Sequence, residues 1–174
     1  MSMYIRQAAP QEVYEVAINM RDKDYEELSA LMWTEGREEL AESMAQRCDA
    51  LANIYAVGSD EDGVVAVISY MPHRPGVWGL GLFATDKFQK VGRFLTKRII
   101  RDIIPALDGA GAHRVEAQSI CGYEEVHDWL RFLGLKEECT LHALGKNGED
   151  FKVFSFTRKP GDRGVRWRKA GEVR

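Results

Sequence analysis

Apolar residues in the first fifty positions recur with the spacing of amphipathic helices. After a short alternating segment over residues 3–8, the pattern predicts a helix from Pro10, because a proline in the first helical turn loses no hydrogen bond. A second helix is expected from Asp24, which has capping-box spacing to Glu27, and a third from about Glu35. The residues expected on the buried faces of these helices are Val13, Val16, Ala17, Met20, Leu28, Leu31, Met32, Leu40, Met44, Cys48 and Leu51.

The pattern changes to strands after residue 52. Apolar segments are separated by a turn-rich connection over residues 59–63, which is typical of a hairpin. A long helix with Phe88, Val91, Leu95 and Ile99 on its inner side is expected to follow, capped by Thr85 or Asp86. The remaining expected elements are strands over residues 53–57, 64–70, 77–84, 113–119, 135–144 and 151–157, and a helix over residues 124–133 that stops at Gly134.

The order of these elements, β-α-α-β-β-β-α-β-α-β-β, predicts an α/β (α+β) fold. We expect a mixed central sheet of about seven strands flanked by about four helices. The length of 174 residues suits one domain, which we place at residues 1–158, with residues 159–174 as a C-terminal tail. Trp33, Trp78 and Trp129 are expected in the core, where aromatic side chains usually pack.

Charge is distributed unevenly along the chain. The net charge is −3, yet residues 158–174 alone carry +5, which leaves −8 on the rest. A tryptophan among cations suits docking onto nucleic acid or onto an acidic protein surface. The alternative is a solvated terminus. The candidate partner-binding residues are Arg163, Arg166, Trp167, Arg168 and Lys169.

Composition argues against several classes of protein. The three cysteines and four histidines lack the spacing of a disulfide framework or of a metal site, so no metal is expected. No apolar run approaches the roughly 20 residues needed to cross a bilayer, and the N-terminus lacks the pattern of a secretory signal. We therefore expect a protein that stays in the cytoplasm in which it is made.

Two segments resemble the GNAT superfamily of acyl-CoA-dependent N-acetyltransferases. Gln89–Phe94 follows the strand over residues 77–84 and is similar to the family's pyrophosphate loop, Gln/Arg-x-x-Gly-x-Gly/Ala. Val126–Leu135 resembles its late helix and closing glycine. The resemblance implies acetyl-CoA as cofactor, held where backbone N–H groups at a helix N-terminus can bind phosphate. The implied cofactor-binding residues are Gln89, Lys90, Val91, Gly92 and Arg93.

The chain departs from the family pattern at two positions. Phe94 stands where the family has glycine or alanine, and a phenyl group there would crowd the phosphates. Leu130 stands where many members have a tyrosine that protonates the leaving thiolate, and leucine has no proton to donate. Candidate catalytic residues are therefore Glu116, as a base for an amine, and Tyr123, two helical turns before Leu130. The glutamates Glu124 and Glu125 are further candidate bases, or capping groups at a helix start.

A closer resemblance is to bacteriophage GNAT-like proteins of the internal virion protein A type. Met20–Glu27 is similar to their Met-Arg-x-x-Asp-x-x-Glu signature, and two later segments, residues 78–86 and 129–135, follow in the same order. It implies a non-catalytic component of virion assembly or of the internal virion, with other virion proteins as partners. The alternative is an active N-acetyltransferase. Arg21 and Asp24 are expected to form exposed ion pairs of about 0.3–0.5 kcal/mol, rather than a functional cluster.

Overall fold

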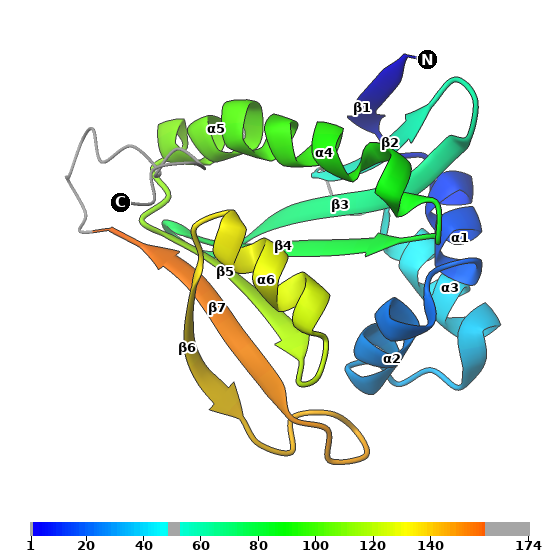
Figure 1. The fold of residues 1–174 in the computed structure, drawn as a ribbon. Coiled ribbons are helices and arrows are strands. Elements are labelled where there is room, and N and C mark those ends of the chain that lie inside the picture. The colour runs from blue at the N-terminus through cyan, green and yellow to red at the C-terminus, as the bar shows by residue number, and fades with distance from the viewer. Residues whose placement is uncertain (1, 49–52, 159–174) are drawn as a thin grey trace. The chain divides into compact units, whose positions relative to one another are not determined.

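Seven strands and six α-helices occur in the residues that the structure, a computed structural model, describes: 2–48 and 53–158 (Figure 1). In chain order they are β1 (Met3–Gln7), α1 (Pro10–Ile18), α2 (Asp22–Ala30), α3 (Gly36–Cys48), β2 (Ile54–Ser59), β3 (Gly63–Arg74), β4 (Val77–Ala84), α4 (Phe88–Arg98), α5 (Ile104–Gly109), β5 (Arg114–Ile120), α6 (Glu124–Phe132), β6 (Lys136–Leu141) and β7 (Phe151–Thr157).

The strands follow the order β1-β2-β3-β4-β5-β7-β6 in a mixed sheet. β4 and β5 pair in parallel through Val77–Gly79 and Arg114–Glu116, whereas β1 with β2, β2 with β3, β5 with β7 and β6 with β7 pair antiparallel. The predicted α/β class and seven-stranded mixed sheet are confirmed. The chain divides into two compact units, Met1–Tyr70 with Gly81–Leu95 and Met71–Leu80 with Thr96–Arg174.

In the first unit, α1 and α3 pack against the strands. Their apolar stripes, predicted from the sequence, meet Ala56 of β2, Val67 of β3 and Phe83 of β4 in one buried cluster. The four consecutive residues Val65–Ile68 are all buried, which requires cover on both faces of β3.

In the second unit, β5 lies beside β7 and alternates between buried and partly exposed positions. Val115 and Ala117 are buried, while Arg114 and Glu116 lie on the opposite, partly exposed face. β6 is an edge strand whose first four residues are exposed, and its charged side chains discourage pairing with another chain.

The long helix expected after Thr85 has three parts. α4 is followed by a π-helical turn, Ile99–Ile103, which leads directly into α5. Pro105 accounts for the break in the regular α-helical hydrogen bonding, because it has no N–H to donate to the carbonyl of Arg101. The described part of the chain therefore contains six α-helices where about four were expected.

Three expectations for the α2 region are wrong. Asp24 does not cap α2, which begins at Asp22 after Arg21, and Asp24 instead lies buried in its first turn. Leu31 and Trp33 were expected in the core but are 43% and 99% exposed. Because α2 ends at Ala30, Leu31 no longer follows the helical period that predicted its burial, and Trp33 lies in the connection to α3. Leu51 and residues 159–174 lie outside the described residues.

Candidate functional site

The turn between β4 and α4 is the place where the sequence predicts a phosphate site. It is short: Thr85 donates its backbone N–H to Val65 O at 2.9 Å, and Phe88 donates to Thr85 O at 3.0 Å. Three residues, 85–87, therefore separate the end of β4 from the start of α4. The N–H groups of a helix's first turn point out of its N-terminus, where they and the helix dipole favour an anion.

A buried ion pair fixes α2 to the end of β4. Asp24, only 4% exposed, accepts two hydrogen bonds of 2.9 Å and one of 3.1 Å from the guanidinium of Arg21, and one of 2.8 Å from the backbone N–H of Ala84. The N–H of Arg21 in turn donates to Ala84 O at 2.9 Å. The pair is therefore not the exposed one expected from the sequence. Breaking a buried pair on one side typically costs about 3–5 kcal/mol, so this contact belongs to the framework of the turn.

The same guanidinium covers the first residue of α4. The Arg21 Cζ atom lies 5.0 Å from the centre of the Phe88 ring, within the range of a cation–π contact. The ring also approaches Gly92, where an added Cβ would lie 3.4 Å from the nearest ring carbon. Gly92 thus lies against an aromatic ring, and a side chain larger than alanine there would displace Phe88.

The five residues predicted to bind the cofactor all lie in the first two turns of α4. Gln89, Lys90 and Arg93 are exposed, whereas Val91 is fully buried and can offer only its backbone. Phe94, on the next turn, is half-buried. These five residues are consecutive in α4, and their role in binding a cofactor stays a prediction.

An internal carboxylate holds the two lysines of this region. The oxygens of Asp62, in the β2–β3 turn, lie 2.8 and 2.9 Å from Nζ of Lys90, and one of them lies 3.3 Å from Nζ of Lys87. The hydrogen bond from Lys90 lowers the pKa of Asp62, and the same bond raises the pKa of Lys90. Both lysines are therefore partly neutralised before any phosphate arrives.

In the second unit, Glu116 belongs to a polar cluster on the sheet. Arg114 Nε lies 2.6 Å from Glu116, and its terminal nitrogens lie 3.0 and 2.7 Å from Glu138. Ser155 donates to Glu138 at 2.6 Å. Partial burial pushes the pKa of Glu116 upward, but hydrogen bonds from Arg114 and His73 outweigh it and hold that pKa below its usual range. Glu116 alone is therefore a weak base.

His73, which the sequence analysis did not select, completes the cluster. Its Nδ1 lies 3.3 Å from Glu116 Oε1. Gly79 makes this approach possible, because a Cβ there would lie 2.3 Å from the imidazole carbon Cε1. Gly79 also pairs directly with Glu116 in the β4–β5 ladder. The signal in the sequence was a glycine within a strand, which often marks a close approach.

The two α6 positions highlighted by the sequence are both buried. Tyr123 precedes the first turn of α6, and Leu130, at 5% exposure, is part of the core. Between them His127 is fully buried, with Nε2 3.1 Å from Ile120 O. Leucine at position 130 leaves that place on α6 without a side-chain proton donor.

Two further observations bear on cofactors and on the membrane. Within residues 2–48 and 53–158, no group of three or more His, Cys, Asp or Glu side chains is arranged to hold a metal ion. None of the helices in this described part is long and apolar enough to cross a membrane. The candidate partner-binding residues Arg163, Arg166, Trp167, Arg168 and Lys169 lie outside it.

No protein-family model and no curated protein matches the sequence, but solved structures resemble the chain. An N-acetyltransferase from Staphylococcus aureus Mu50 has a TM-score of 0.65 at 13% identity, over 90% of this chain and 99% of that one. The ribosomal-protein-S5-alanine acetyltransferase from Vibrio fischeri has a TM-score of 0.63 at 16% identity, over 97% of this chain and 97% of that one. A GNAT-family acetyltransferase from Bacillus anthracis has a TM-score of 0.64 at 13% identity, over 90% of this chain and 95% of that one. The chain has the fold of the GNAT-family acetyltransferases.

Proposed function

We propose that this chain binds acetyl-CoA at the β4–α4 turn and transfers the acetyl group to an amine. The observation that carries the proposal is the short β4–α4 turn, which leaves the N-terminus of α4 close to Gly92, in a chain whose fold is shared with acetyltransferases. Separately, within the second unit, the carboxylate of Glu116 holds one nitrogen of His73, which is a common arrangement for a general base.

The β4–α4 turn fits a pyrophosphate in three respects. The N-terminus of α4 offers backbone N–H groups, Gly92 carries no side chain, and Arg21 with Asp24 fixes the end of β4. Bound there, acetyl-CoA would supply an activated acyl group. Gln89 and Arg93, both exposed, would then contact the phosphates from the first two turns of α4.

In this proposal His73 is the base, and Glu116 positions it. Glu116 accepts the hydrogen bond from Nδ1–H, which leaves Nε2 to take a proton from an amine acceptor. The low pKa of Glu116 suits this role, because a carboxylate that stays ionised can hold the imidazolium formed on proton transfer. Glu116, the base expected from the sequence, thus becomes an orienting residue.

Binding and turnover can be tested separately. We expect calorimetric titration with acetyl-CoA to show micromolar binding, and Gly92→Trp to abolish it because the indole would displace Phe88 and block the turn. Release of free CoA should require an amine, for which a library of peptides with free N-termini and lysines serves as the acceptor. Absence of binding at millimolar acetyl-CoA would overturn the proposal.

A second candidate function is that of a non-catalytic virion protein. It is favoured by Leu130, which replaces the expected proton donor with a buried apolar side chain, and by the resemblance of Met20–Glu27 to phage GNAT-like proteins. In this case the chain is made in the host cytoplasm and enters the virion. Its partners are other virion proteins, and its basic tail contacts nucleic acid or an acidic protein surface. Mass spectrometry of purified particles should then detect it, and its absence from them would refute this role.

A further inference from the structure

The connection between α2 and α3 presents a tryptophan almost wholly to solvent. Trp33 is 99% exposed, and Leu31, two residues earlier, is 43% exposed. Single exposed apolar residues are ordinary, but a fully exposed indole is not, because it carries the largest apolar surface of any side chain. Tryptophan is also among the residues that contribute most to binding where proteins meet.

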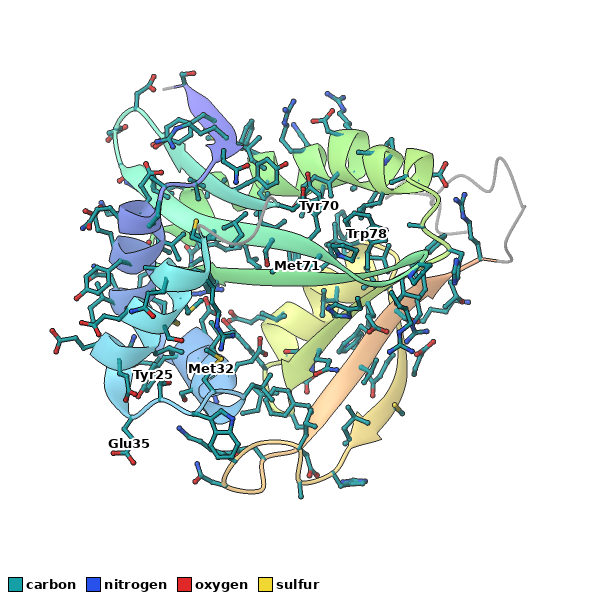
Figure 2. All side chains as sticks on the ribbon, turned by 180° about the vertical axis from the view of Figure 1, so that it is seen from behind. Tyr25, Met32, Glu35, Tyr70, Met71 and Trp78 are labelled. Atoms are coloured by element: carbon teal, nitrogen blue, oxygen red, sulfur yellow. The ribbon has the colours of Figure 1, made fainter. Side chains whose placement is uncertain are left out.

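The rest of this connection is firmly held. Met32 packs against the core of the first unit, and Thr34 is buried. The backbone N–H of Glu35 donates to the carboxylate of Glu39 at 2.7 Å, at the start of α3. Figure 2 shows the side chain of Glu35 directed outward. Trp33 is therefore presented by an ordered segment, so binding through it would cost little entropy.

Its surroundings are acidic. From the start of α2 to the end of α3 there are eight carboxylates and three cations, a net charge of −5 in a chain whose total is −3. Asp22, Asp24 and Glu26 are paired with Arg37, Arg21 and Lys23. Four further carboxylates of this stretch are exposed and lie on or just before α3, at Glu35, Glu38, Glu39 and Glu42. An exposed indole two residues before the first of these carboxylates suits a basic segment, which gains both ion pairs and cation–π contacts.

The chain itself contains a segment of this chemistry. Residues 159–174 carry six basic and two acidic residues, a net charge of +4, with Trp167 among them. Arg158, just before it, is tied to the second unit by its N–H to His113 O at 2.9 Å and by an ion pair with Asp108. Sixteen residues can extend over about 55 Å, far enough to reach another molecule.

We propose that Trp33 and the carboxylates of α3 dock the basic C-terminal segment, residues 159–174, of a second copy of this chain. The surface lies on α2 and α3 and uses neither His73 nor the β4–α4 turn. The interaction therefore does not depend on acetyl transfer. It is electrostatic in part, so it weakens as added salt screens the charges.

Sedimentation velocity of the full chain tests the proposal. At about 50 mM salt we expect reversible self-association that 500 mM salt weakens. Trp33→Ala should raise the dissociation constant by about tenfold or more, as loss of a central aromatic residue commonly does. Phe132→Ala is the matched control, because Phe132 is an exposed aromatic residue of α6 and should change nothing. A chain that stays monomeric up to millimolar concentration, or that associates equally well as Trp33→Ala, would overturn the proposal.

Charge exchange identifies the occupant directly. Glu38→Lys with Glu42→Lys should abolish association, and so should Arg166→Glu with Arg168→Glu. A mixture of these two double variants should associate again, because each supplies the charges that the other has lost. Failure of the mixture to associate, or association that requires added nucleic acid, would show that another partner occupies this surface and would refute the proposal.

Discussion

Two clusters of charge, one in each unit, use similar residues in different ways. Around Asp24 in the first unit, the carboxylate is buried and bonds to a backbone N–H as well as to Arg21. Around Glu116 in the second unit, the carboxylate bonds to the side chains of Arg114 and His73 and stays partly open to solvent. The first cluster fixes the backbone of the β4–α4 turn, whereas the second fixes the orientation of its side chains relative to one another.

The contrast suggests a division between framework and chemistry. Removing a charge from a buried pair leaves its partner without compensation, and the whole fold bears that cost. Removing one from a partly solvated cluster lets water replace the lost contact, so stability changes little. Reactivity changes more there, because a proton-transfer group depends on its orientation. The predictions below test this division.

Asp24→Asn should have the largest effect. The amide can still accept the N–H of Ala84, but it cannot neutralise Arg21, and we expect a loss of about 3 kcal/mol in the free energy of unfolding measured with urea. Asp22→Asn, two residues earlier on α2, is the control. Its side chain is fully exposed, so solvent screens its pair with Arg37 and the free energy of unfolding should change little. Equal losses in the two variants would contradict the division.

His73→Ala should lower catalysis and leave stability almost unchanged. We expect kcat for acceptor-dependent CoA release to fall about 100-fold, the usual contribution of a general base, with stability changed by less than about 1 kcal/mol. His142→Ala is the matched control, because His142 is also an exposed histidine held through Nδ1 by a carboxylate, that of Asp150 at 2.9 Å. If His73→Ala lowered stability as much as Asp24→Asn does, His73 would have to be counted among the residues that support the fold.

The sequence could predict the elements but not these clusters. Periodic apolar positions set α1, α3 and α4, and turn residues set the β2–β3 hairpin. The contact between Asp24 and Ala84 joins positions 60 residues apart, and that between His73 and Glu116 joins positions 43 apart. No local pattern encodes such distances. The expectation that Trp33 lies in the core rests on the usual packing of aromatic residues. It does not take into account that α2 ends at Ala30, before Trp33.

Asp62→Asn tests the lysines of the β4–α4 turn. Removing the carboxylate that neutralises Lys87 and Lys90 should leave a more positive turn, and we expect acetyl-CoA to bind about fivefold more tightly. The control is Asp60→Asn, because Asp60 is an exposed residue of the same hairpin, and its affinity for acetyl-CoA should rise less. Calorimetry distinguishes the outcomes. Unchanged affinity of Asp62→Asn would mean that the lysines do not face the phosphates. If the unmodified chain and both variants all failed to bind acetyl-CoA, the proposed cofactor would be refuted instead.

Glu138 offers the smallest effect and shows how the second cluster responds to acid. The hydrogen bond from Arg114, with that from Ser155, lowers the pKa of Glu138 to about 2. A carboxyl group whose pKa is lower in the folded than in the unfolded protein stabilises the fold above its unfolded pKa of about 4.3, and this contribution is lost as pH falls towards 2.

More than a third of the Glu138 side chain is exposed, so solvent screens the pair and the contribution should stay below about 1 kcal/mol. Urea unfolding at pH 5 and pH 3 measures it. We expect Glu138→Gln to reduce the loss of stability between these two pH values, because the amide has no proton to gain. Glu125→Gln, at an exposed position of α6, should leave that loss unchanged. An equal reduction in both variants would attribute the acid response to net charge, whereas a reduction above 2 kcal/mol for Glu138→Gln would make the second cluster as much a part of the framework as the first.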